Sequence, residues 1–411
     1  MEDSVSLIWN AVHRLDRWLD RNGWSGYDPY DLREAPLFQA LASRGTIPWA
    51  SRSRDVLFTL DKYLPVFTRR LFRVKPRVNA KAMGLMAKGY LKLFRATGDS
   101  RYRKKAESCL DWLLKNPSEG YHGLCWGYPF DWQSHLLIPK GTPSGVVSSV
   151  VGDAFWEAYE TFDDSSFLDI CLSICRFFVE DLNRDRIEED CLCFSYTPLD
   201  GFHVHNANLF VSEFLVRVGS KAGRDDLVRY GRLGSHYALR EQNPDGSLYY
   251  WGKVQNAFNP FRVDHYHAGF EMRMLFGLWR STHDESYFSA LSDYYSFYLD
   301  NLIAIRDDRV MPRMTPRSTY PVNIHACAES ILCNAILSKA FPRASRLLPP
   351  LCRFVIETMQ TETGWFRYRI LKTRFGLIPN NIPYLRWGQA WMLLALSSCL
   401  EALNGSNRAG P

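Results

Sequence analysis

Two kinds of apolar pattern alternate along the chain. After Asn79, small and apolar residues fill most positions of the stretch NAKAMGLMAKGYL, whereas after Ser100 charged residues are interleaved with Leu and Trp. Small side chains suit a crowded inner helix, and the amphipathic stretch suits an outer helix with one solvated face. The polar turn Gly98-Asp99-Ser100 supplies a helix stop and a helix cap between them. We therefore predict a helical hairpin, and no convincing pair of strands accompanies it.

This hairpin pattern recurs six times at a nearly constant spacing. Each inner helix follows a loop rich in Trp, Tyr, His and Asn, and successive helix starts are 63, 64, 59, 60 and 59 residues apart. They fall at Asn79, Thr142, Asn206, His265, His325 and Tyr384. A period of this size is typical of a repeat architecture. The predicted fold class is therefore all-α, an (α/α)6 toroid in which six helical hairpins close into a ring.

The sixth hairpin is expected to be split between the two ends of the chain. Its inner helix is the C-terminal stretch YLRWGQAWMLLALSSCLEAL, and its outer helix is the amphipathic N-terminal stretch, so that the N-terminal helix pairs with the C-terminal one. Length alone would suggest two or three domains, but the repeat overrides that expectation. We expect one toroid domain over residues 1–404, an inserted helical segment at about 31–78, and a disordered tail over 405–411.

The inserted segment ends in a basic amphipathic stretch, residues 64–77. Its cations are Arg69, Arg70, Arg73, Lys75 and Arg77, and its apolar residues include Leu64, Phe67 and Leu71. The simpler interpretation is an outer helix with a solvated basic face. The alternative is a peripheral contact with an anionic membrane or with a protein partner.

Composition excludes several functional classes. A net charge of +6 over 411 residues, without a dense basic stripe, argues against a nucleic-acid partner. The N-terminal helix lacks the features of a signal peptide, and the apolar stretch from Trp391 is too short to span a bilayer, so a cytoplasmic location is expected. The ten cysteines lack zinc-site spacing and are interpreted as small buried side chains. No phosphate-binding loop or dinucleotide motif occurs, and no cofactor is expected.

Histidine is concentrated where the inner helices begin. A closed ring brings all six helix N-termini to one end of a central pit, and their unpaired N–H groups favour anionic or hydroxyl-rich ligands there. Five of the ten histidines fall at three successive helix starts: His203, His205, His265, His267 and His325. We interpret the group as functional. A metal site is an alternative, but the spacing gives only a weak signal and no metal is predicted.

The remaining candidates come from the same loops. Asp131 in WGYPFDWQ and Asp264 beside His265 are the acid candidates, and together with His205 and His267 they form the expected catalytic set. The expected substrate-binding residues are Trp126, Trp132, His203, Asn206, His265, Tyr266, His325, Tyr384, Arg386 and Trp387. Aromatic rings suit stacking on sugars, and Arg386 suits a clamp for a carboxylate.

The repeat pattern and these loops resemble the six-hairpin glycosidase-like superfamily over nearly the whole chain. The segments WGYPFDW, HVHNAN, DHYHAG and YLRWGQAW are also similar to those of proteins associated with bacterial or archaeal polysaccharide clusters. Members of the superfamily include glycoside hydrolases, unsaturated-uronide hydrolases, N-acylglucosamine 2-epimerases, and uronate lyases and epimerases. The resemblance implies a carbohydrate-active enzyme whose substrate is a poly- or oligosaccharide, and the basic balance favours one containing uronic acid.

Three functions stay open from the sequence. Glycoside hydrolysis would use a carboxyl pair such as Asp131 and Asp264. An epimerase or lyase would instead abstract a proton with His205, His267 or Tyr266, and would use Arg386 as a clamp. The third hypothesis is a toroid that binds a glycan or a partner without catalysis.

Overall fold

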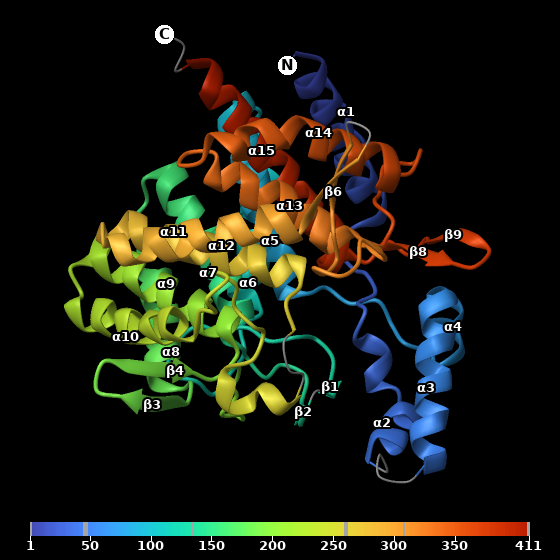
Figure 1. The fold of residues 1–411 in the computed structure, drawn as a ribbon, viewed down its shortest axis with the longest axis horizontal. Helices are drawn as coiled ribbons and strands as arrows, with labels where there is room; N and C mark the ends of the chain where they lie inside the picture. The colour runs from blue at the N-terminus through green and yellow to red at the C-terminus, as the bar shows by residue number, and fades with distance from the viewer. Residues whose placement is uncertain (1, 44–47, 134, 259–261, 307–308, 409–411) are drawn as a thin grey trace.

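The computed structural model describes residues 2–43, 48–133, 135–258, 262–306 and 309–408 (Figure 1). Six helices form an inner ring: α5 (Ala80–Thr97), α7 (Gly145–Phe162), α9 (His205–Ala222), α11 (His265–Thr282), α13 (Ile324–Leu337) and α15 (Ala390–Arg408). A single π-helical turn, η3 (Leu385–Gln389), leads into α15. The predicted helix starts lie within a few residues of those observed, and the all-α (α/α)6 toroid is confirmed.

Outer helices complete the six hairpins. They are α6 (Ser100–Lys115), α8 (Ser166–Glu180), α10 (Asp225–Glu241), α12 (Glu285–Asn301), α14 (Pro342–Met359) and α1 (Glu2–Asn22). Side-chain caps start several helices: Asn79, Ser144, Asp264 and Asn323 accept hydrogen bonds from the first turns of α5, α7, α11 and α13. Gly98 ends α5 in the left-handed conformation that glycine adopts without strain.

The ring closes between the first and last inner helices. Helix α5 packs against α7 on one side and α15 on the other, and α1 packs against α14 and α15. Glycine allows the inner helices to approach closely: a Cβ at Gly89 of α5 would lie 3.1 Å from Leu393 of α15, and one at Gly84 would lie 3.0 Å from Val151 of α7. In Figure 1 both ends of the chain lie at the top of the molecule, beside these helices.

Short antiparallel strand pairs occupy the loops between hairpins. They are β1 (Trp132–Gln133) with β2 (Leu137–Ile138), β3 (Arg184–Glu188) with β4 (Cys191–Phe194), and β5 (Ile303–Arg306) with β6 (Arg309–Pro312). A three-stranded sheet has the order β7 (Val322–Asn323), β8 (Arg369–Thr373) and β9 (Gly376–Asn380). These pairs are not predictable from the sequence pattern, because strands of two to five residues carry too little periodicity to detect.

The segment before α5 forms a separate arm. It contains η1 (Asp31–Glu34), α2 (Pro36–Ser43), α3 (Pro48–Tyr63) and α4 (Pro65–Leu71), which stand beside the ring in Figure 1. Arg69 anchors α4: its guanidinium is buried and contacts Asp31 at 2.9 Å and Asp61 at 2.5 Å. Arg77 pairs with Glu34. The basic face expected over 64–77 therefore excludes Arg69, which points inward.

The C-terminal helix is longer than expected. Helix α15 continues to Arg408, past Asn404 where the sequence analysis placed the end of the toroid, and residues 409–411 lie outside the described ranges. None of the helices in those ranges combines the length and the apolar character that crossing a bilayer requires.

Candidate active site at the N-terminal end of the inner helices

A cavity of about 400 Å³ lies at the end of the ring where the inner helices begin. Its wall contains the second residue of every inner helix, with the π-turn counted as the start of the sixth: Lys81, Val146, Asn206, Tyr266, His325 and Arg386. Equivalent positions on helices arranged around one axis face that axis in the same way. One helical position, repeated six times, therefore builds a ring of side chains that come from six separate hairpins.

Aromatic side chains form a large part of the wall of this cavity. The rings are Tyr30, Tyr128, Trp132, Tyr196, Tyr250, Trp251, Tyr266 and Trp387. Trp132 is the centre of one group, with ring centroids 5.9 Å from Tyr30, 5.8 Å from Tyr128 and 5.6 Å from Tyr196. The indole nitrogens of Trp132 and Trp387 are buried and have no hydrogen-bond partner among the described residues. Rings and unsatisfied donors of this kind suit the faces and hydroxyl groups of a sugar.

Asp264 and His267 form a hydrogen-bonded pair at the start of α11. The Asp264 carboxylate accepts hydrogen bonds from the backbone N–H of His267 at 3.2 Å and from its ring Nδ1 at 2.9 Å. Arg262 donates from Nε to the same carboxylate at 3.1 Å. Burial acts to raise the pKa of Asp264, but the charges and hydrogen bonds of His267 and Arg262 outweigh it and lower the pKa to about 2.

The protonation of His267 follows from this pairing. An ionised carboxylate only accepts hydrogen bonds, so Nδ1 of His267 carries a proton. Burial lowers the pKa of His267, although Asp264 acts against that shift, and the ring is therefore neutral at neutral pH. A neutral ring with a proton on Nδ1 has a free lone pair on Nε2. His267 lines the cavity, and it can accept a proton from a bound molecule.

Lys81 and His325 are two further nitrogen groups in the cavity wall. Lys81 Nζ lies 5.5 Å from the ring centre of Trp391, and no carboxylate of the described residues is within ion-pair distance of it. Burial, helped by the charge of Arg386, lowers the pKa of Lys81 to about 7. Both ring nitrogens of His325 are buried without a partner in the described part of the chain, and burial with the charge of Lys81 keeps the pKa of His325 far below its usual range.

Arginines add positive charge to the same wall. Arg33, Arg262 and Arg386 line the cavity together with Lys81. Arg386 is held by Asp28, which accepts its Nε at 2.5 Å and its second amino group at 2.7 Å. The guanidinium carbon of Arg386 also lies 4.8 Å from the ring centre of Tyr128. Arg386 is therefore fixed in the wall by a buried ion pair that the sequence analysis did not foresee.

Three of the predicted histidines contact outer helices instead. His203 bonds Tyr237 of α10 at 3.1 Å and Asp185 at 2.9 Å. His205 stacks on the same tyrosine at 5.2 Å, and burial lowers its pKa to about 3. His265 is held between the carbonyl of Arg313 and the hydroxyl of Tyr298 in α12, both at 3.0 Å. None of the three lines the cavity.

Three other predicted residues also lie outside the cavity wall. Asp131 accepts hydrogen bonds from Gln39 at 3.1 Å and from the backbone N–H of Lys140 at 2.8 Å. The buried indole of Trp126 donates to the Leu113 carbonyl at 3.0 Å. Tyr384 lies beneath the guanidinium of Arg69, 5.1 Å from ring centre to carbon. The cavity thus gathers Trp132, Asn206, Tyr266, His267, His325, Arg386 and Trp387 from the predicted set, and Asp264 joins it through His267.

Sequence reasoning missed Lys81, Tyr30, Arg33, Tyr196, Tyr250 and Arg262. A signal for Lys81 was present, because it is a cation in the first turn of an inner helix otherwise made of Ala, Gly, Met and Leu. Its position relative to the cap Asn79 matches that of His325 relative to Asn323 and Tyr266 relative to Asp264. Aligning the six helix starts on their caps would have selected it.

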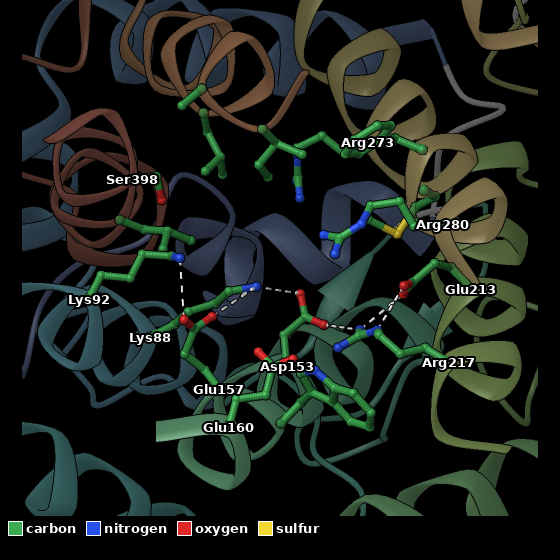
Figure 2. A pocket seen from close by; sticks show the side chains of 18 of the residues that line it. Lys88, Lys92, Asp153, Glu157, Glu160, Glu213, Arg217, Arg273, Arg280 and Ser398 are labelled. Atoms are coloured by element: carbon green, nitrogen blue, oxygen red, sulfur yellow. Dashed lines mark hydrogen bonds and ion pairs between the residues drawn. The ribbon is translucent and has the colours of Figure 1, made fainter. Parts of the chain in front are cut away.

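A larger cavity of about 590 Å³ lies toward the other end of the inner helices (Figure 2). Figure 2 shows its ion pairs: Asp153 contacts Lys88 at 3.1 Å and Arg217 at 2.5 Å, and Glu157 contacts Lys92 at 3.3 Å. These carboxylates are neutralised by cations on neighbouring helices, and the pairs tie α5, α7 and α9 together. The arrangement is that of a structural network, so the smaller cavity is the candidate site. Among the described residues, no group of three or more His, Cys, Asp or Glu could hold a metal ion.

Comparisons with known proteins agree with this architecture. No family model matches the chain, and no curated protein matches it in sequence. Among solved structures, a sugar epimerase from a ruminal bacterium is 12% identical with a TM-score of 0.61, over 81% of this chain and 88% of that one. An unsaturated glucuronyl hydrolase specific for heparin is 11% identical with a TM-score of 0.60, over 98% and 99%. A GH76 α-mannanase of Bacteroides thetaiotaomicron is 10% identical with a TM-score of 0.59, over 80% and 88%.

These identities are low, so the likeness concerns the fold. The three similar structures share one architecture but have different activities, so the fold alone does not assign any of their reactions to this chain. What the likeness establishes is the fold: the chain has the (α/α)6 toroid that the sequence pattern predicts.

Proposed function

We propose that the protein is a carbohydrate-active enzyme that binds a sugar with an anionic group, of the uronate kind, and moves a proton on the carbon beside its carbonyl or carboxyl group. Epimerases, isomerases and lyases share this step. The observation that carries the proposal is the Asp264–His267 pair, which leaves a neutral imidazole with a free Nε2 at the wall of an aromatic, cationic cavity.

His267 is the proposed base. Its Nε2 takes the proton as the C–H bond breaks, and the electron pair of that bond passes into the adjacent carbonyl group as an enolate. Asp264 holds the ring in one tautomer and stabilises the imidazolium that forms. Return of the proton to the other face of the carbon gives an epimer, and loss of a neighbouring leaving group gives an unsaturated product.

Lys81 is the proposed anchor for the anionic group. No carboxylate of the described residues lies within ion-pair distance of Lys81, whereas Arg262 is paired with Asp264 and Arg386 with Asp28. A bound carboxylate would supply the missing negative charge and favour the charged ammonium. The same cations would stabilise the developing enolate. Arg386, the clamp expected from the sequence, instead supports the wall in this proposal.

Glycoside hydrolysis is supported less well by this geometry. Hydrolysis through a carboxyl pair needs two carboxyl groups on either side of the glycosidic bond. Of the described residues that line the cavity, none contributes a carboxylate. Asp131 is engaged with Gln39 and Lys140, and Asp264 with His267 and Arg262. Proton abstraction by His267 needs neither carboxylate to touch the sugar.

The test is proton exchange with solvent. Purified protein is incubated in D₂O with hexuronates, uronate-containing oligosaccharides and matched neutral sugars, and the products are followed by NMR. We expect either deuterium at the carbon beside the carbonyl or carboxyl group of the acidic sugars, or an unsaturated product formed from them by elimination. His267→Gln should abolish this exchange, and His13→Gln, an exposed histidine of α1, should leave it unchanged. Release of reducing ends with neither deuterium at any carbon nor an unsaturated product would show a hydrolase and overturn the proposal.

A further inference from the structure

Two segments far apart in sequence share a face of the molecule that is both basic and apolar. They are helix α4 with the residues that flank it, 62–78, and the β8–β9 hairpin, 369–380. The side chain of Asn380 in β9 donates a hydrogen bond to the carbonyl of Lys62 at 3.0 Å, which joins the two segments. Figure 1 shows α4 in the arm and the hairpin projecting at the same side of the ring.

Large apolar side chains are exposed on this face. Leu64, Phe67 and Leu71 follow one side of α4 and are 51%, 52% and 56% exposed. Phe375, at the hairpin turn, is 82% exposed, and Leu377 and Ile378 next to it are also exposed. A cluster of this kind marks a contact surface.

The charged residues of the two segments are all basic. Residues 62–78 and 369–380 contain nine of the 50 lysines and arginines and none of the 44 acidic residues, which leaves 41 basic and 44 acidic residues in the rest of the chain. Lys62, Arg70, Arg73, Lys75, Lys372 and Arg374 are exposed. None of them forms an ion pair with another described residue. Arg69 and Arg77 are paired with acids outside the two segments, so these six exposed cations supply the positive charge beside the exposed apolar side chains.

We propose that this basic and apolar face docks onto an anionic membrane surface. Cations surrounding exposed Phe and Leu side chains are the combination that inserts apolar groups at the headgroup level while binding acidic lipids. A protein partner would need a matching acidic surface with apolar pockets for two separate projections, whereas a fluid lipid surface accommodates both. This surface is independent of the reaction proposed for the cavity.

The face borders the cavity through the arm. Arg33 lines the cavity, and its guanidinium carbon lies 5.7 Å from the ring centre of Phe58 in α3, the helix that leads into α4. Docking would therefore hold the arm, and the side of the cavity that it forms, close to the bilayer.

Vesicle binding tests the proposal on the full-length protein. Sedimentation is measured with phosphatidylcholine vesicles that contain or lack phosphatidylglycerol. We expect binding only to the anionic vesicles, with a loss at raised salt. The double variant Phe67→Ser/Phe375→Ser should reduce partition about tenfold or more, and Lys372→Glu/Arg374→Glu about fivefold or more for each charge.

Matched controls use exposed residues outside the two segments. Leu199→Ser/Ile305→Ser and Arg101→Glu/Arg176→Glu should leave partition unchanged. Wild-type protein that stays in the supernatant with anionic vesicles would overturn the proposal, as would control variants that lose as much binding as the test variants. A Phe67-dependent dimer or a captured protein, without vesicle binding, would assign the face to a second copy or to a protein partner instead.

Discussion

Arg386 and Asp28 are 358 positions apart in sequence and form a buried pair with two parallel hydrogen bonds. Both sides are almost fully enclosed, so neither charge is solvated by bulk water. Because both groups are desolvated, removing one partner leaves the other charge buried and unpaired, which strongly lowers the stability of the fold. It joins the loop after the first helix to the start of the sixth inner helix, and it fixes one wall of the candidate site.

Breaking this pair from one side should destabilise the fold. Arg386→Met leaves the Asp28 carboxylate buried without its partner, and the free energy of unfolding should fall by about 3–5 kcal/mol. Urea denaturation measures the change. Adding Asp28→Asn to the same chain should restore part of the loss, because the uncompensated charge is then removed. Arg101→Met, at an exposed ion pair with Asp99, is the control and should leave the midpoint unchanged. If the free energy of unfolding falls no further than in that control, the buried pair does not contribute to stability.

Asp264→Asn should disturb the orientation of the base His267 and leave sugar binding nearly unchanged. Asparagine still caps α11, so the helix should be retained. It no longer forces the proton onto Nδ1 of His267, and the rate of proton exchange should fall by about 100-fold or more. KM should change little, because Asp264 does not touch the cavity contents. Ser144→Asn, at the cap of α7, is the matched control and should keep the rate. Equal rates for Asp264→Asn and wild type would remove Asp264 from the mechanism.

Binding of an anionic sugar should take up a proton near neutral pH. The pKa of Lys81 is about 7 without ligand, since burial and Arg386 oppose its charge, and a carboxylate beside it would raise that pKa. Affinity should therefore fall as pH rises above about 7. Titration calorimetry in buffers of different ionisation enthalpy measures the uptake. Lys81→Met should abolish the uptake and weaken anionic sugars by about 10- to 150-fold. A pH-independent affinity in the wild type would contradict this role.

Acid should weaken the ion-pair network shown in Figure 2. Burial acts to raise the pKa of Glu157, but Lys92, Lys88 and Arg95 outweigh it and lower the pKa from 4.5 to about 2. A pKa that is lower in the folded state means that this stabilisation is present above pH 4.5 and is lost as pH falls toward 2. The free energy of unfolding of Glu157→Gln should therefore fall less between pH 4.5 and pH 2 than that of the wild type.

The control for that experiment lies in the same cavity. Glu160 forms no ion pair with another described residue, so Glu160→Gln should leave the slope of unfolding free energy against pH as in the wild type. Urea midpoints at several pH values give both slopes. Identical slopes for Glu157→Gln and wild type would place the acid-sensitive groups elsewhere.

The ring could be predicted from the sequence because its signals are local. Caps such as Asn79 and Asp264, the stop at Gly98, and small residues at close contacts such as Gly84 and Gly89 are visible without knowing the partner helix. Their repetition then implies closure. The strand pairs have no repeated counterpart, so nothing in the period predicted them. The arm was expected only as an inserted helical segment at about 31–78, because that stretch breaks the period.

The site was predictable only to the level of the helix start. His265 and His267 are only two residues apart in α11, but two residues correspond to a turn of about 200° around a helix. His265 therefore contacts Tyr298 of the outer helix, whereas His267 faces the cavity. Choosing between them requires the rotation of α11 about its axis, which is set by packing against α9 and α13. The rotation of α9 about its own axis likewise places His205 against α10 and Asn206 in the cavity wall.

The position of Lys81 in the first inner helix and Arg386 in the last has a consequence for biosynthesis. While the chain is being made on the ribosome, α5 is complete long before α15 exists, and its Gly89 side has no neighbour to cover it. The half-built ring is an open arc with an exposed apolar edge, the kind of surface that chaperones bind and that associates with other nascent chains. Because each hairpin contributes at least one wall residue, the cavity acquires its full wall only when the final helix docks, so incomplete chains have no assembled site.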